Sequence, residues 1–316
     1  MKKILFVMVF LNIKLYAEII EFSSANPFSF SDVINSFSEQ ETINVFGELK
    51  FPDKKENKEY PLVIGVAGSL GWKKHHYDQL KIFRDMGIAT FELNSFKSRG
   101  ISSTVGTQTE VTTAMMILDS YKALDVLAQD LRIDAEKIAI VGWSLGGGTA
   151  LFSGWNALIE AINPQYNFAA HLSYYPPCVA IPDNLDFTTA PMHILIGEID
   201  DWTPSFACEE LVLKLNKKGY DAGITVFENS HHSFDSELEL IEVDNGYSLK
   251  DCSFKIRDDG AVVMNFMEIP MTTPFLQKIG LFACADRGTT IAGNSEARIL
   301  AHEFSKFFMS KYLIEN

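Results

Sequence analysis

Short runs of consecutive apolar residues alternate along the chain with longer segments in which apolar residues recur every three or four positions. Residues 62–68 (LVIGVAG) and 137–143 (KIAIVGW) are apolar at most positions, as is typical of parallel strands buried on both faces. Residues 42–52 alternate apolar and polar instead and end at Pro52, which predicts a half-buried strand. Further strands are predicted at residues 88–93, 168–175, 192–198 and 223–229.

Amphipathic helices are predicted between these strands. One predicted helix closes on Gly87, and another opens at Pro204 and ends with Lys-Lys-Gly, which are common helix boundaries. Alternating strands and helices predict an α/β fold with a mostly parallel central sheet flanked by helices and joined by right-handed crossovers. The predicted helices span residues 77–87, 109–131, 204–219 and 295–313.

Residues 246–290 interrupt this alternation. They contain CSFKIRDDGAVVMNF, a hairpin-like segment with Asp-Gly at its turn, and then an irregular stretch with proline that reaches CADRGTT. We interpret residues 246–290 as an insertion before the terminal helix, within one domain spanning residues 18–316.

Composition bounds the number of domains and argues against one class of partner. The chain has 316 residues, of which 47% are hydrophobic, enough for one large α/β domain. The formal net charge of −14 argues against a nucleic-acid partner, because such surfaces need clustered Lys and Arg. The sequence leaves the oligomeric state open.

The first residues resemble an export signal. Lys2 and Lys3 precede an apolar run at residues 4–11, and Ala17 is a small residue suited to cleavage. The run is short for a bilayer span, so we predict a signal peptide at residues 1–17 and a periplasmic or secreted protein. An uncleaved anchor is the alternative. No later segment is long and apolar enough for a membrane helix, so no stable membrane anchor is expected.

A lone serine lies among glycines in VGWSLGGG, residues 141–148. GWSLG fits the pattern G-x-S-x-G between a predicted strand and a predicted helix, which is typical of a nucleophile on a tight turn. Gly142 and Gly146 would relieve crowding around such a turn. The N–H of Leu145, at the helix start, would point to where an oxyanion forms. Ser144 is therefore the candidate nucleophile.

A serine nucleophile needs a histidine base oriented by a carboxylate. Asp200 and Asp201 follow the strand predicted at 192–198, and His231 and His232 follow the next one. Both pairs therefore lie at the carboxyl ends of strands, where parallel sheets build their sites. The order Ser, Asp, His matches hydrolases with this kind of turn. The histidines and cysteines show no zinc-binding spacing, and no metal or organic cofactor is expected.

Residues 42–235 and the terminal helix resemble the dienelactone hydrolase branch of the α/β-hydrolases. The matches include LVIGVAGSLGW, GWSLGG, GEIDDWTP and HHSFD. The resemblance favours Asp200 and His232 within their pairs, leaves Asp201 as a solvated turn residue, and implies a second oxyanion N–H at Ser69. Two departures put lactone specificity in doubt. The name-giving enzyme has a cysteine nucleophile where this chain has serine, and many relatives have a histidine where this chain has Ala67.

Two further residues are candidates for substrate binding. Arg99 follows the strand that ends near Leu93, so it could bind a substrate carboxylate, or pair with a structural acid such as Glu110. Trp143 flanks the nucleophile and could contact substrate or simply pack.

The four cysteines would be oxidised after export. Four cysteines allow three connectivities. Cys178 and Cys208 lie near the carboxyl ends of strands expected to be neighbours, and Cys252 and Cys284 flank the insertion. We therefore predict the pairs Cys178–Cys208 and Cys252–Cys284.

The leading hypothesis is an exported serine hydrolase that cleaves a small-molecule ester or lactone through an acyl-enzyme. A peptidase or thioesterase would use the same residues. A non-catalytic periplasmic binding protein that keeps a hydrolase fold is the alternative from another class.

Overall fold

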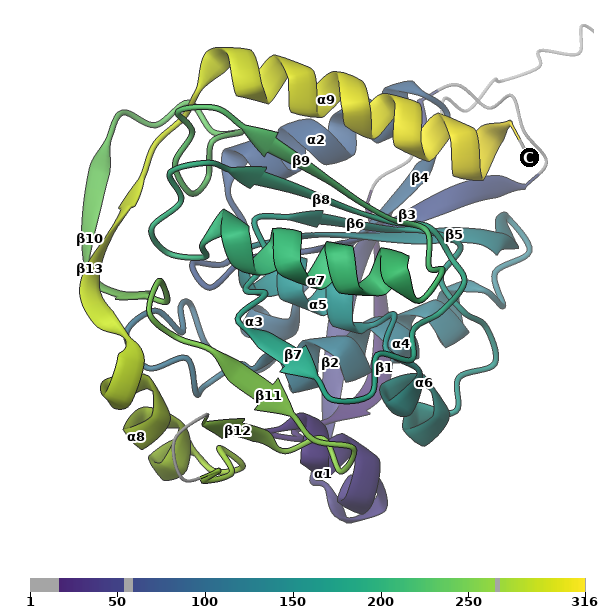
Figure 1. Cartoon of the computed structure of the whole chain (residues 1–316). Coiled ribbons are helices and arrows are strands. Elements are labelled where there is room, and N and C mark those ends of the chain that lie inside the picture. The colour runs from purple at the N-terminus through teal and green to yellow at the C-terminus, as the bar shows by residue number, and fades with distance from the viewer. Residues whose placement is uncertain (1–16, 54–58, 265–267, 316) are drawn as a thin grey trace, which may run out of the picture.

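The structure is a computed structural model that describes residues 17–53, 59–264 and 268–315 (Figure 1). The predicted signal peptide, except Ala17, lies outside these residues. The core is an eight-stranded sheet in which six neighbouring strands run parallel and two more pair antiparallel at one edge. The predicted mostly parallel sheet is therefore confirmed. In spatial order the strands are β1 (Glu18–Ala25), β2 (Thr42–Lys50), β4 (Ala89–Leu93), β3 (Tyr60–Val66), β5 (Ile133–Trp143), β6 (His171–Tyr174), β8 (Met192–Gly197) and β9 (Ala222–Phe227).

Each strand predicted for this sheet forms, and the central strands are buried by layers on both faces, whereas β2 and β9 at the sides of the sheet are only partly buried. Every residue of β3 is buried, as is every residue of β5 from Ile138 onward. The edge strand β1 was not predicted. Its residues are partly exposed along most of their length, so its hydrophobic signal is weak.

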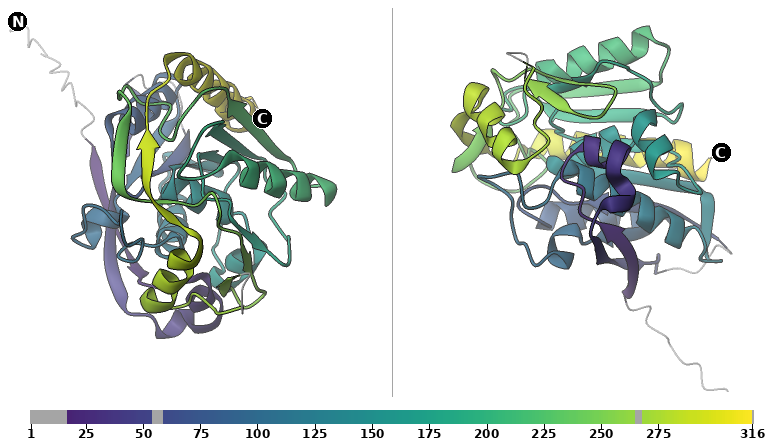
Figure 2. Two further views of the ribbon diagram at one scale, coloured as in Figure 1. Left: turned by 60° about the vertical axis from the view of Figure 1, so that its left-hand side comes forward. Right: turned by 90° about the horizontal axis from the view of Figure 1, so that it is seen from below.

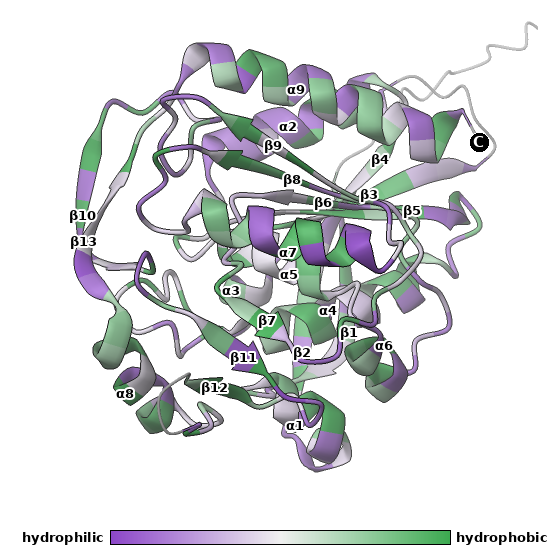
Figure 3. Ribbon diagram, in the orientation of Figure 1, coloured by the Kyte–Doolittle hydropathy of each residue, from purple (hydrophilic) through white to green (hydrophobic). Residues whose placement is uncertain are grey.

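Helices cover both faces of the sheet. Helices α2 and α9 lie on one face, and α4, α5 and α7 lie on the other (Figure 1). Hydrophobic and hydrophilic residues alternate along α9 (Figure 3), as expected for a helix with one face on the sheet. The helices are α1 (Phe30–Ser36), η1 (Phe37–Glu39), α2 (Lys74–Asp85), α3 (Ser95–Ser98), α4 (Thr113–Leu127), α5 (Leu145–Phe152), α6 (Asn156–Ile162), α7 (Ser205–Lys217), α8 (Pro274–Cys284), α9 (Ser295–Met309) and η2 (Ser310–Ile314).

The insertion is more ordered than its sequence indicated. The predicted hairpin forms as β11 (Phe254–Ile256) and β12 (Val262–Met264), and β7 (Ala180–Pro182) joins it. The stretch expected to be irregular contains helix α8. Strand β10 (Ile241–Ser248) pairs with β13 (Asp286–Ile291) along one side of the molecule (Figure 2).

The hairpin and α8 lie on the same side of the molecule as α1 (Figures 1 and 2). The Asn35 side chain at α1 donates to the carbonyl of Asp259 at the hairpin turn, at 2.8 Å. The insertion therefore packs against the N-terminal segment, although the two are more than 200 residues apart in the sequence.

The carboxyl ends of β5, β6, β8 and β9 lie next to one another in the sheet. Four residues singled out by the sequence or by the structure follow these strands directly or within a short loop. They are Ser144, Tyr175, Asp200 and His232.

Candidate active site

Ser144 lies on a sharp turn between β5 and α5. Its backbone has φ 56° and ψ −116°, a conformation that costs free energy for a residue with a side chain and is found mainly at functional sites. Glycine is required on both sides of the turn. A Cβ at Gly142 would lie 1.8 Å from the carbonyl oxygen of Gly146, and a Cβ at Gly146 would lie 2.1 Å from that of Val66. The G-x-S-x-G pattern therefore reflects backbone crowding around Ser144.

The structure brings Ser144, His232 and Asp200 into one hydrogen-bonded chain. The Ser144 hydroxyl lies 2.9 Å from Nε2 of His232, and Nδ1 of His232 lies 2.7 Å from Oδ2 of Asp200. A carboxylate acts only as an acceptor, so Nδ1 carries the proton and Nε2 is left to accept from the serine hydroxyl. The imidazole is thus arranged as a base toward Ser144.

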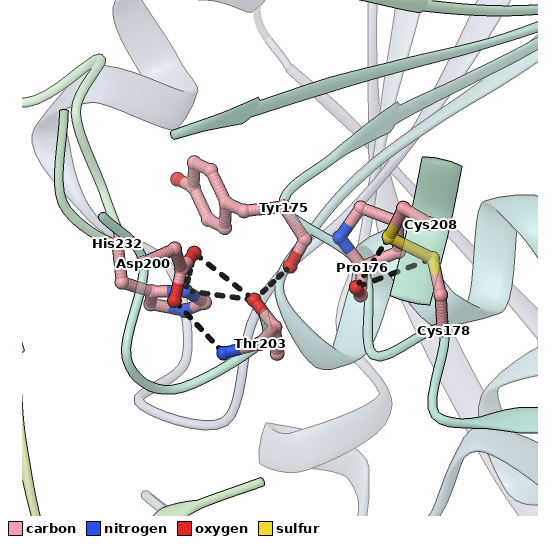
Figure 4. Close-up of a disulfide and its surroundings, with 7 residues drawn as sticks. All are labelled: Tyr175, Pro176, Cys178, Asp200, Thr203, Cys208 and His232. Carbon is pink, nitrogen blue, oxygen red and sulfur yellow. Dashed lines mark hydrogen bonds and ion pairs between the residues drawn. A yellow bond between two sulfur atoms is a disulfide. The ribbon is translucent and has the colours of Figure 1, made fainter. Parts of the chain in front are cut away.

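Asp200 is held in place by its own turn. It is 2% exposed, and Oδ1 accepts from the backbone N–H groups of Trp202 and Thr203 at 2.9 and 2.8 Å. The Thr203 hydroxyl donates to Oδ2 at 3.0 Å and lies 3.1 Å from the carbonyl of Tyr175 (Figure 4). These bonds fix the carboxylate toward the imidazole. Thr203, in the motif GEIDDWTP, was not predicted as a site residue.

Two aromatic rings fix the imidazole of His232. The Tyr175 ring lies 4.5 Å from it and the Trp202 ring 5.1 Å, measured between ring centroids. His232 is 3% exposed. The carbonyl of His232 accepts from the N–H of Ala292, just after β13, at 3.1 Å, so the insertion's last strand also fixes the histidine loop.

Asp201 and His231, which are adjacent in sequence to Asp200 and His232, contact strand β13 and not Ser144. Asp201 accepts from both the backbone N–H and the hydroxyl of Thr290, each at 2.8 Å, and His231 Nδ1 lies 2.8 Å from the same hydroxyl. The interpretation of Asp201 as a solvated turn residue was therefore wrong. Its carboxylate links the β8 loop to β13.

The two backbone N–H groups expected to bind an oxyanion belong to residues that line the cavity at Ser144. Ser69 and Leu145 line the same cavity as Ser144, and within the described part of the chain neither N–H donates to a protein acceptor. The Ser69 loop is fixed by its carbonyl, which accepts from the N–H of Thr104 at 3.0 Å, and by its hydroxyl, which donates to Gln108 Oε1 at 3.2 Å.

Gln108 also has a strained backbone. Its φ is 56°, and its carbonyl accepts from Nε2 of Gln277 on helix α8 at 2.7 Å. Gln108 therefore joins the Ser69 loop to the insertion. No local sequence signal identified this role, because it depends on a contact with a residue 169 positions away.

Arg99 is paired inside the protein and lines neither of the cavities at Ser144, so its prediction as a substrate-binding residue is corrected. Its guanidinium forms a buried ion pair with Asp119 of α4 at 2.7 Å, with side-chain exposures of 6% and 0%. It also donates to Asn26, Ala25 and Ser95. The alternative prediction, that Arg99 pairs with a structural acid, is right, but the acid is Asp119 and not Glu110. Glu110 instead accepts from the hydroxyls of nearby threonines.

Trp143 packs, as one of the two alternatives predicted for it, and it also lines a small pocket beside Ser144 and His232. Its side chain is fully buried, so the ring packs beneath the nucleophile turn, and its Nε1–H donates to Oδ2 of Asp235 at 3.0 Å. The other oxygen of Asp235 accepts from the Tyr175 hydroxyl at 2.8 Å. Burial, and then the Asp235 charge, raise the pKa of Tyr175 well above its usual value. The phenol therefore stays protonated and donates. This network, missed by the sequence analysis, connects three loops of the site.

Both expected pairs of cysteines are joined in the structure. Cys178 is bonded to Cys208 across a separation of 30 residues, and Cys252 to Cys284 across 32. The first disulfide ties the loop after β6 to α7, next to the segment that carries Asp200 (Figure 4). The second disulfide joins the segment before β11 to the end of α8, within the insertion.

No group of three or more His, Cys, Asp or Glu side chains in the described ranges could hold a metal ion. Among the helices of that same part of the chain, none is long and apolar enough to cross a membrane.

Known proteins are similar to this chain in sequence or in fold. A sequence model of the dienelactone hydrolase family matches residues 92–249. Non-reducing polyketide synthase ausA of Emericella nidulans is 22% identical over 148 residues, which cover 45% of this chain but only 6% of that protein. Among solved structures, a dienelactone hydrolase-like promiscuous phosphotriesterase from metagenomic libraries aligns with a TM-score of 0.55 and 14% identity, covering 93% of this chain and 98% of that one. Thermogutta terrifontis esterase 2 phosphoramylated by tabun aligns at 0.50 with 16% identity, covering 69% and 85%.

Proposed function

The chain belongs to the dienelactone hydrolase family of α/β-hydrolases and is a carboxylic ester hydrolase, and from this premise we propose that Ser144, His232 and Asp200 carry the reaction through an acyl-enzyme. The observation that supports this most directly is the continuous hydrogen-bonded chain from Ser144 Oγ through the imidazole to Asp200. The substrates are small-molecule esters.

In the first half of the reaction, Ser144 Oγ attacks the ester carbonyl carbon while its proton passes to His232 Nε2. Asp200 accepts the Nδ1–H and stabilises the imidazolium. The carbonyl electron pair moves to the oxygen, and the resulting oxyanion accepts from the N–H groups of Ser69 and Leu145. The tetrahedral intermediate then collapses, and the alcohol leaves with the proton from His232.

In the second half, a water molecule attacks the acyl-enzyme. His232 takes the proton of the water, and the same two N–H groups stabilise the second oxyanion. Collapse returns the proton to Ser144 Oγ and releases the carboxylic acid. Acid and base roles are thus filled by one histidine.

Export is part of the proposal. Residues 1–17 have the composition of a signal peptide, and two disulfides lie in the remainder of the chain. Disulfides persist in oxidising compartments, so a periplasmic or secreted enzyme of residues 18–316, forming one domain with the 246–290 insertion, fits both observations. Mass spectrometry of the mature protein tests this by giving its N-terminal residue.

The test of the mechanism combines mutation with labelling. Ser144→Ala and His232→Ala should each lower kcat for an activated p-nitrophenyl ester by about 10⁴-fold or more, and the double variant should lose little more, because the residues act as a unit. A fluorophosphonate should add one adduct to the wild type and none to Ser144→Ala.

His231→Ala is the matched control, since this histidine is adjacent in sequence but bonds Thr290. It should keep most of the activity. The proposal is wrong if Ser144→Ala is still labelled at the same rate, and the histidine assignment is wrong if His231→Ala is the inactive variant.

A further inference from the structure

The cavity at Ser144 is apolar and uncharged. Its volume is about 210 Å³, and all twenty of the described residues that line it are uncharged at neutral pH. Its polar groups are hydroxyls and amides, including those of Gln108 and Gln277. A carboxylate entering this cavity would lose its hydration without gaining a cation, which carries a large free-energy cost.

The insertion builds much of the cavity wall. Cys252 and Cys284 join the segment before β11 to the end of α8, so the wall is covalently closed. The N-terminal segment contributes Phe28 and Phe30. The apolar wall residues from the insertion are Tyr247, Leu249, Phe254, Val262, Met271 and Leu281.

This cavity lies on the acyl side of the nucleophile. It is lined by Ser144 and by both oxyanion residues, Ser69 and Leu145, but His232 is not among its lining residues. A second, smaller pocket of about 40 Å³ is lined by Ser144 and His232 together; it shares Ser69 with the larger cavity but not Leu145. His232 must hand its proton to the leaving oxygen, so the alcohol belongs in the smaller pocket and the acyl chain in the larger one.

The volume sets the size of the acyl group. An apolar cavity of about 150 Å³ is large enough to bind benzene. At about 210 Å³ the acyl cavity is larger, so an acyl chain of roughly six carbons fits.

We propose that this enzyme selects esters of neutral, apolar carboxylic acids of about six carbons, with the insertion serving as the acyl-binding wall. The proposal rests on the Ser144 mechanism above. It separates this chain from any relative that recognises a substrate carboxylate, because the side chain expected to do so, Arg99, is committed to Asp119.

The test compares methyl acetate, methyl butyrate, methyl hexanoate and methyl decanoate, whose small leaving alcohol suits the smaller pocket, with monomethyl adipate, which matches hexanoate in acyl carbon number but carries a carboxylate. Release of acid is followed by titration at constant pH. Each methylene removed from water is worth at most about fourfold in kcat/KM. We expect hexanoate to exceed acetate by at least tenfold and to exceed the adipate monoester by about 100-fold. Decanoate should gain nothing over hexanoate.

Two variants locate the effect in the insertion. Leu281→Trp should lower kcat/KM for hexanoate by more than tenfold and leave acetate within about threefold, because the larger ring fills the cavity. Gln277→Arg, at a partly exposed position of α8, should raise kcat/KM for the adipate monoester at least tenfold. Phe282→Ala is the control, since this neighbour on the same helix is 90% exposed. Phe282→Ala should change neither the hexanoate-to-acetate ratio nor the hexanoate-to-adipate ratio of kcat/KM.

The two proposals fail in different ways. If acetate is hydrolysed in a Ser144-dependent reaction but hexanoate is no faster, or the adipate monoester is equally fast, the acyl wall is refuted and the mechanism stands. If no ester is hydrolysed and Ser144 is not labelled, the mechanism itself is refuted. An unchanged hexanoate-to-acetate ratio in folded Leu281→Trp would also overturn the acyl assignment.

Discussion

The buried pair of Arg99 and Asp119 gives a quantitative test of the assignment of Arg99 to structure and not to substrate. Arg99→Met keeps the aliphatic stem and removes the guanidinium. Asp119 then remains fully buried with the Ser24 hydroxyl, at 2.5 Å, as its remaining side-chain donor. Removing one partner of a buried ion pair costs about 3–5 kcal/mol. An entropy of unfolding of about 2.1 cal/mol/K per residue gives roughly 0.6 kcal/mol/K for this chain length, so Tm should fall by about 5–8 °C.

The assay is thermal and urea unfolding followed by tryptophan fluorescence, with kcat/KM measured in parallel for hexanoate and adipate monoesters. Arg99→Met should lower the midpoint without changing the ratio of the two kcat/KM values. Arg99→Met/Asp119→Leu should regain most of the lost stability, because no uncompensated charge remains. The reasoning is refuted if Arg99→Met unfolds within about 1 kcal/mol of wild type, or if it selectively slows the carboxylate-bearing substrate.

Stability should fall in acid: burial lowers the pKa of His171 and of His193 to about 4, so the unfolded chain binds more protons than the folded one between about pH 6.5 and 4. The stability that these histidines contribute is complete above pH 6.5 and is lost as pH falls toward 4. Urea midpoints from pH 7 to 5 should show this, and His171→Gln should flatten the slope by up to about 1.4 kcal/mol per pH unit; an equally steep slope in that variant would contradict it. Replacing Cys178 and Cys208 by serine together should lower the free energy of unfolding by about 3–4 kcal/mol, the loop-closure value for a loop of this length. Urea midpoints that match those of the wild type would show that this bond does not stabilise the fold.

The sequence determined those features whose physical cause is local. The central strands β3 and β5 are visible as consecutive apolar runs because they are buried on both faces, and β2 is visible as an alternation because it is half-buried. Gly142 and Gly146 mark the nucleophile turn because a Cβ at either would overlap neighbouring backbone. Chain order and strand-end placement indicated the Asp and His pairs, since parallel strands bring their carboxyl ends to one edge of the sheet, and the family resemblance favoured Asp200 and His232 within those pairs.

Tertiary structure alone decided which side chains and strands from distant parts of the chain contact each other. Arg99 could have turned to substrate or to any nearby acid, and its choice of Asp119 follows from helix α4 packing beside the short helix α3. Strands β10 and β13 pair although they are about 40 residues apart, and neither has a local pattern that shows the pairing.

The proposed acyl wall shows the same limit most clearly. Leu281 is one apolar residue of a helix whose neighbour Phe282 is 90% exposed, and the sequence gives no sign of which of the two lines the cavity at Ser144. That orientation is set by the Cys252–Cys284 bond and by the bond from Gln277 to Gln108, both of which are contacts between distant residues. Local sterics and periodicity are encoded residue by residue, whereas the shape of a cavity depends on segments that meet only after folding.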